Sequence, residues 1–166
     1  TERIMRARHP RTALQDQPIP VRAKLAAAWT SFMFLYVYVD ILGLYKPGII
    51  DDILDGKVFT FDISQTWAVT VLSLLAVPIL MIVLSMTLPA RVNRPLNLIV
   101  AAAYVPFTVF NVAGGSWLYY YSLGVVLELV LLGLIVRYAW KWPRTARSAS
   151  MAASPGRDGL HAQQPA

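Results

Sequence analysis

The stretch TWAVTVLSLLAVPILMIVLSMTL, from Thr66 to Leu88, contains 23 residues and no charged side chain. A helix of that length is about 35 Å long at a rise of 1.5 Å per residue. The hydrocarbon core of a bilayer is about 30 Å thick, so this segment can cross it with a modest tilt. The segment therefore predicts a membrane-spanning helix and sets the class to which the rest of the chain must conform.

Three further segments have the length and composition of spans, or nearly so: residues 25–45, 96–113 and 118–140. The first is interrupted by Asp40, and the last carries Glu128 and, near its end, Arg137. The segment 96–113 is the shortest and the most polar. Together the four segments predict an all-α membrane protein, an up-down bundle of four transmembrane helices.

The composition of the 166 residues agrees with a membrane protein, since 57% are hydrophobic and 14% charged. Soluble domains average about 45–50% and about 25%. Cysteine is absent, which excludes disulfides and thiol chemistry, and the two histidines, His9 and His161, lie outside the spans. No Ser–His–Asp set, HExxH motif or Gly-rich phosphate loop is present. We expect no enzyme activity, no cofactor and no metal site.

The basic residues set the orientation, because Lys and Arg resist translocation across the membrane. Thirteen lie before residue 25, in the 89–95 connection or from Arg137 onward, and only Lys46 and Lys57 lie on the opposite side. Both termini are thus expected on the cytoplasmic side of the membrane. In so apolar a chain the net charge of +6 indicates this asymmetry and no nucleic-acid partner. The candidates for lipid-headgroup or topology roles are Arg91, Arg94, Arg137 and Lys141.

The expected layout is a basic cytoplasmic arm at 1–24, a four-helix transmembrane domain at 25–142 and a disordered cytoplasmic tail at 143–166. In the outer loop, the apolar residues of IIDDIL (49–54) recur at helical spacing opposite its acidic ones. Pro47 suits the first turn of a helix and Gly56 suits its end. The loop therefore predicts a short amphipathic helix on the extracytoplasmic side, between the first two spans.

Polar residues inside a membrane helix are costly unless they face protein or water, so their spacing indicates the buried face. In the third span Asn97, Ala101, Tyr104, Thr108 and Asn111 follow one another in steps of 4, 3, 4 and 3, so the polar residues share one face of a helix with the small Ala101. Similar faces occur in the other three spans. The candidate intramembrane polar site comprises Asp40, Glu128, Tyr36, Tyr104, Thr108, Asn111 and Ser73.

The two intramembrane carboxyls are the strongest functional signal in the chain. A charged carboxyl at the centre of a span costs about 2.5–3.5 kcal/mol on insertion scales. One interpretation is a proton relay, a cation site or a contact to a cationic ligand. The alternative is a protonated carboxyl whose interhelical hydrogen bond fixes packing. In both cases we expect Glu128 to face the bundle interior, near Tyr36 and Tyr104.

The connection before the third span, RVNRPLN (91–97), is flanked by Pro89 and contains Pro95. Two prolines so close together predict a cytoplasmic turn with little further structure. Asn93 is expected to supply a turn hydrogen bond. Arg91 and Arg94 either contact lipid phosphate or serve topology alone.

Four short motifs resemble a known family: VDILGLY (39–45), ISQTW (63–67), RVNRPLN (91–97) and YAWKW (138–142). In this order, with a Glu in the last span, they are similar to DUF6326, a family of small bacterial four-helix membrane proteins of unknown function. The resemblance touches all four spans and implies a four-span bacterial membrane protein. It implies no reaction.

Two functions from different classes follow. The first is a non-enzymatic accessory, assembly or binding subunit of a larger membrane complex, in contact with lipids and with other subunits or copies of itself. The alternative is an oligomeric proton- or cation-coupled transporter or channel that uses Asp40 and Glu128, because one four-helix bundle rarely encloses a wide path. A membrane enzyme acting on lipid, with the carboxyls as acid and base, is the weakest candidate.

Overall fold

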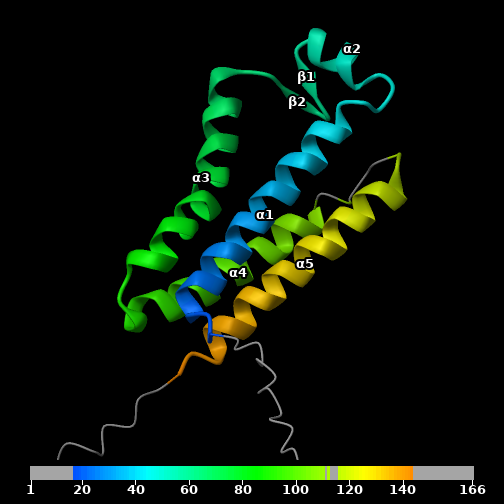
Figure 1. Ribbon diagram of the computed structural model, residues 1–166. Coiled ribbons are helices and arrows are strands. Elements are labelled where there is room, and N and C mark those ends of the chain that lie inside the picture. The colour runs from blue at the N-terminus through cyan, green and yellow to red at the C-terminus, as the bar shows by residue number, and fades with distance from the viewer. Residues whose placement is uncertain (1–16, 111, 113–115, 144–166) are drawn as a thin grey trace, which may run out of the picture.

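The computed structural model describes residues 17–110, 112 and 116–143, and four long helices dominate them (Figure 1). These are α1 (Val21–Gly43), α3 (Gln65–Thr87), α4 (Ala90–Phe110) and α5 (Leu118–Trp140). Between α1 and α3 lie the short helix α2 (Ile49–Leu54) and a two-stranded hairpin, β1 (Lys57–Val58) and β2 (Phe61–Asp62). Three of the long helices, α1, α3 and α5, are long and apolar enough to cross a membrane. The expectation of an all-α helical bundle is confirmed, with three candidate spans as in a multi-pass membrane protein.

The four long helices alternate in direction, and α1 runs between α3 and α5 (Figure 1). α4 packs along α5 and has few contacts with α3, among them a hydrogen bond from Tyr104 to the backbone of Leu74. From the turn that joins α3 to α4, α3 leans away from α4 toward the end of the bundle that carries α2. The three buried residues of α3 are Pro78, Met81 and Ser85, all in its second half. The end of the bundle that carries α2 is called the outer end here, and the opposite end the inner end.

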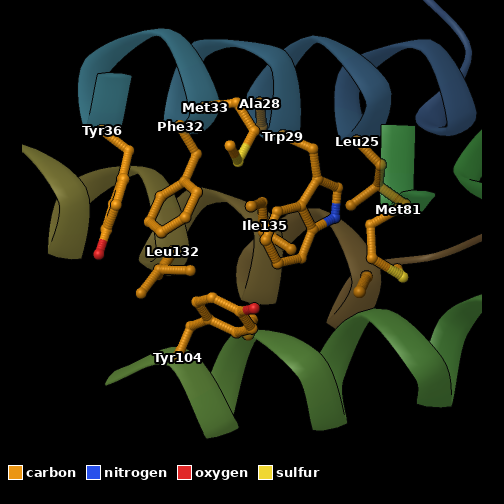
Figure 2. Close-up of a cluster of buried hydrophobic side chains, with 12 residues drawn as sticks. Leu25, Ala28, Trp29, Phe32, Met33, Tyr36, Met81, Tyr104, Leu132 and Ile135 are labelled. Carbon is orange, nitrogen blue, oxygen red and sulfur yellow. The ribbon is translucent and has the colours of Figure 1, made fainter. Parts of the chain in front are cut away.

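The core lies between α1, α4 and α5 and is rich in aromatic side chains. Figure 2 shows Trp29, Phe32 and Tyr36 leaving one face of α1 toward Tyr104 of α4, with Leu132 between the helices. The rings of Phe32 and Trp29 meet edge to face at 5.8 Å between centroids, and those of Phe32 and Tyr104 at 6.0 Å. Such contacts add about 0.5–1.5 kcal/mol each to the area they bury. The aromatic cluster fills the middle and the inner half of the bundle.

The start of α4 corrects the prediction for residues 89–97. The helix begins at Ala90, directly after Pro89, so residues 91–97 form two turns of the α-helix in place of the expected loop. The span expected at 96–113 thus starts six residues earlier. A proline inside a helix has no N–H to donate to the carbonyl four residues before it. For Pro95 this carbonyl lies in the first turn of α4, near the inner end, where headgroups and water can donate a hydrogen bond to it. Because it starts earlier, α4 includes charged residues. Its hydropathy is therefore lower than that of the other three long helices.

The outer loop contains one predicted and one unpredicted element. The short helix at 49–54 is confirmed as α2, and positive φ angles at Gly48 (86°) and Gly56 (77°) allow the chain to turn at both its ends. The hairpin that follows was not predicted, because strands of two residues carry no alternation to recognise. Of the flanking segments, residues 1–16 and 144–166, including most of the expected arm and tail, lie outside the described residues. α1 begins at Val21, so residues 21–24 belong to the helix.

Candidate functional site

Glu128 of α5 and Thr108 of α4 form a buried polar pair between these two helices. Their side chains lie next to each other, with 1% of Glu128 and none of Thr108 exposed. Apart from each other, the carboxyl oxygen Oε2 of Glu128 and the hydroxyl Oγ1 of Thr108 have no hydrogen-bond partner among the described residues. Nine-tenths or more of buried polar atoms in proteins are paired, so two adjacent unpaired oxygens mark a place that calls for a ligand, a proton or water.

Asp40 of α1 lies on the outer side of this pair. Its side chain is exposed, and it is within electrostatic range of Glu128, Tyr120 and Tyr121. The Tyr120 hydroxyl donates to the backbone oxygen of Val39 at 2.7 Å, which ties α5 to α1 beside Asp40. No Lys, Arg or His occurs between residues 25 and 45 or between 95 and 136. The helices that carry both carboxyls thus provide no basic partner at this depth.

Close packing of α1 on α5 holds the carboxyls at their positions. A Cβ atom added to Gly124 would lie 3.0 Å from Cγ2 of Val39, so any larger residue there would force the Val39 side chain to shift by a few tenths of an ångström. Gly124 precedes Glu128 by four residues and lies on the same face of α5. The predicted face of the fourth span, Tyr121, Gly124 and Glu128, is therefore the face that packs on α1 and α4.

The other predicted site residues lie at different places. The Tyr104 hydroxyl donates to the backbone oxygen of Leu74 in α3 and so links α4 to α3. Tyr36 is buried and stacks on Phe107 of α4, with 6.2 Å between ring centroids and 13° between ring planes. Ser73 is exposed on α3, and its hydroxyl donates to the backbone oxygen of Val69 at 2.7 Å. Asn111 lies outside the described residues.

A second polar cluster, in the inner half of the bundle, was not predicted as a unit. Asn97 Oδ1 accepts from Trp29 Nε1 at 2.7 Å and from the Ser85 hydroxyl at 3.3 Å. Asn97 Nδ2 donates to Asn93 Oδ1 at 2.6 Å, and Asn93 Nδ2 donates to the backbone oxygen of Ser85 at 2.6 Å. This inner network joins α1, α3 and α4 with every side chain buried.

The spacing of the asparagines was the signal that could have revealed the inner network. Asn93 and Asn97 are four residues apart, so on a helix that starts at Ala90 they extend the polar face that runs through Tyr104. The predicted turn at 91–97 concealed this relation. The expected turn hydrogen bond of Asn93 does exist, although weakly, at 3.5 Å to the backbone oxygen of Leu88.

The predicted headgroup residues gather at the inner end. Arg94 Nε donates to the backbone oxygen of Ala139 at 3.2 Å, and its guanidinium lies 5.7 Å from the centre of the Trp140 ring. Arg91 is exposed and, with Arg94, lines a shallow hollow of about 370 Å³ whose other walls are apolar. Arg137 and Lys141 are exposed at the end of α5. These contacts hold Arg94 against the end of α5, and the headgroup role of all four residues stays a prediction.

The two polar clusters differ in what they can do chemically. The inner network uses its own members as partners, so it serves packing. The outer pair of Glu128 and Thr108 offers two free oxygens and a nearby second carboxyl, a combination suited to a positive charge. On the inner side of the pair the core is closed by Phe32, Leu132 and Ile135, which are at most 1% exposed.

Comparison with known proteins places the chain in a family without assigning it an activity. No curated protein and no solved structure matches the chain. The family model DUF6326, described as a family of unknown function, matches residues 20–149. This range contains all four long helices and both polar clusters. The resemblance seen in the four short motifs is thereby confirmed, and the chain belongs to the DUF6326 family.

Proposed function

We propose that the protein is a non-enzymatic accessory subunit of a larger membrane complex, which it joins through a lateral groove between α3 and α4. One observation carries the proposal: α3 has buried residues only in its inner half, whereas its outer half is largely exposed and is joined to α4 by the hydrogen bond from Tyr104 to Leu74. Its three buried residues all lie from Pro78 onward, whereas residues 68–70, 72–74 and 77 are exposed. A helix that is apolar and only half packed has a face free for another helix.

The groove has a composition that suits a helix. Its volume is about 280 Å³, and it is lined by Leu74, Val77, Ile99, Val100, Ala103, Tyr104 and Phe107. Ala103 contributes a small side chain to the α4 side, and small residues let a second backbone approach closely. Acyl chains fill such grooves in any membrane protein, but they need no close approach of this kind. We therefore assign the groove to a membrane-spanning helix of the partner.

The proposal includes four membrane spans: the three apolar helices α1, α3 and α5, and in addition α4. The polar residues that lower the hydropathy of α4 are Asn93 and Asn97, which are buried and paired, and Arg91 and Arg94, which lie at its inner end. Neither pair therefore meets the hydrocarbon core unsatisfied. With four spans both termini lie on one side, and the 13 basic residues assign that side to the cytoplasm of the bacterial inner membrane.

The competing function, an oligomeric proton- or cation-coupled transporter or channel, is favoured by Glu128 and Asp40. A path through one bundle would have to pass the core, where Phe32, Leu132 and Ile135 are closed around Tyr104 (Figure 2). Transport would then need a path between several copies. The lateral groove and the closed core both favour the accessory subunit over this alternative.

Site-specific photo-crosslinking in membranes tests the proposal. A photo-reactive residue replaces Val77 or Ile99 in the groove, and Val126 or Val130, two exposed residues of α5, as matched controls. We expect one discrete protein adduct from the groove positions and lipid adducts alone from the controls, with native mass spectrometry giving the partner mass and stoichiometry. A ladder of self-adducts would favour the oligomeric transporter or channel. Lipid adducts alone at all four positions would show that neither a partner helix nor a second copy of the chain occupies the groove.

A further inference from the structure

We propose that Glu128 and Thr108 bind one small cation, a proton or Na⁺, which enters from the outer end of the bundle past Asp40. The proposal concerns the outer pair alone and does not depend on the partner assigned to the groove. The shared chemistry is a single positive charge held between a carboxyl oxygen and a hydroxyl oxygen.

The unpaired oxygens give the first argument. Glu128 Oε2 and Thr108 Oγ1 are both buried and side by side, and apart from each other neither has a hydrogen-bond partner among the described residues. An unpaired buried polar group costs about 1–3 kcal/mol, and more when it is charged. A proton on Oε2 would convert this acceptor into a donor toward Thr108. A Na⁺ ion would accept both oxygens as ligands, with water completing its shell.

The distribution of charge gives the second argument. The titratable groups that face Glu128 are Asp40 from α1 and, through Asp40, Tyr120 and Tyr121 from α5. α4 contributes the uncharged Thr108, and α3 carries no Asp or Glu along its entire length. The spans supply no Lys, Arg or His between residues 95 and 136. Two carboxyls in mutual range without a basic partner attract a cation from outside the chain.

Access gives the third argument and sets the direction of entry. Asp40 is exposed near the outer end of α1, which ends at Gly43. On the inner side of the Glu128–Thr108 pair, the core is closed by Phe32, Leu132 and Ile135. We therefore assign the entry of the cation to the outer end, where Asp40 lies. A cation that enters and leaves at the same end is sensed there and is not carried to the other side.

Thermal unfolding of the full-length protein in detergent micelles tests the proposal in two arms. In the first arm NaCl replaces choline chloride at constant ionic strength, and in the second arm the pH is lowered in choline chloride. For Na⁺ we expect a rise in Tm of a few degrees in the first arm, and for a proton a rise in the second arm alone. Glu128→Gln should lose whichever rise the wild type shows, because the amide holds no net negative charge.

Three further variants keep the test decisive. Thr108→Val should weaken the response, and Thr108→Ser should retain it, since serine preserves the hydroxyl. Asp62→Asn, in the outer hairpin, is the control for a carboxyl outside the site and should respond as the wild type does. The proposal is overturned if the wild type responds in neither arm, or if Glu128→Gln responds as strongly as the wild type.

Discussion

The inner and outer halves of the bundle treat buried polar groups in opposite ways. In the inner half Asn93, Asn97, Ser85 and Trp29 form a closed set of hydrogen bonds, and α3 packs against the bundle there. In the outer half Glu128 and Thr108 leave two oxygens unpaired, and α3 stands off. The difference teaches that one end of this bundle is built for stability, whereas the other retains unsatisfied chemistry and an open side.

The difference has a physical basis in the cost of polar groups inside a membrane. A side chain that finds all its partners within the fold fixes the register of neighbouring helices at little cost. A side chain that lacks a partner lowers stability and is tolerated where another molecule completes it. The inner half therefore provides the rigid base from which the outer half can bind, as is expected when a functional site stands on a packed scaffold.

The largest loss of stability is expected from substitution of Asn97, and it tests whether the inner half is the stable half of the bundle. Asn97→Leu removes the acceptor of both Trp29 and Ser85 and the donor to Asn93, and leaves these groups buried without that partner. We expect the free energy of unfolding to fall by about 2–3 kcal/mol. Denaturant unfolding in mixed micelles, followed by tryptophan fluorescence, measures it.

Thr70→Val is the matched control for Asn97→Leu, because the Thr70 hydroxyl is exposed and donates only to the backbone oxygen of Thr66 in its own helix. This variant should change the free energy of unfolding by less than about 0.5 kcal/mol. Equal effects of the two variants would show that the inner network does not hold the bundle together.

The sequence predicted the helices better than their ends. Long apolar runs predicted α1, α3 and α5 because hydropathy is a property of the segment itself. The start of α4 at Ala90 was not predicted, because Pro89 and Pro95 suggested a turn there. Whether a proline ends a helix depends on what satisfies the freed carbonyl, and that is decided by the surroundings.

The candidate site was predicted in part, for a similar reason. Spacing on one helix face identified Glu128, Thr108 and Tyr104 as inward-facing, and all three are buried. Their partners depend on how neighbouring helices are rotated and tilted, which no single segment encodes. Thus Tyr104 pairs with the backbone of α3, and Ser73 is exposed because α3 leans away.

An intermediate effect at Gly124 sharpens the contrast, because it separates the α1–α5 contact from the open side at α3. A methyl group at Gly124 would lie 3.0 Å from Cγ2 of Val39, whereas one at Gly133 would meet nothing within 4 Å. Gly124→Ala should cost about 1–2 kcal/mol through overpacking. Gly133→Ala should be neutral or slightly stabilising, since alanine favours a helix. The same unfolding assay compares them, and equal costs would show that the outer half is loose on every side.

The smallest expected effect compares two serines on one helix. Ser85 lies in the packed half of α3, where its hydroxyl donates to Asn97 Oδ1 at 3.3 Å, and Ser73 lies in the free half, where its hydroxyl donates to the backbone of α3 itself. Ser85→Ala should cost about 0.6–1 kcal/mol, in the range of interhelical hydrogen bonds in membranes. The loss is modest because Asn97 keeps its donor Trp29 and Ser85 keeps its backbone bond from Asn93.

Ser73→Ala should leave stability unchanged or raise it slightly, since a hydroxyl bonded to its own helix competes with the backbone ladder. The two substitutions remove the same atom from the same helix, so their difference isolates the environment of each half. Repeating both in the background of Asn97→Leu completes a double-mutant cycle: the cost of Ser85→Ala should disappear there, because its side-chain acceptor is gone, while the effect of Ser73→Ala stays as it was. A cost for Ser85→Ala that persists without Asn97 would assign it to lost packing volume and would detach Ser85 from the inner network.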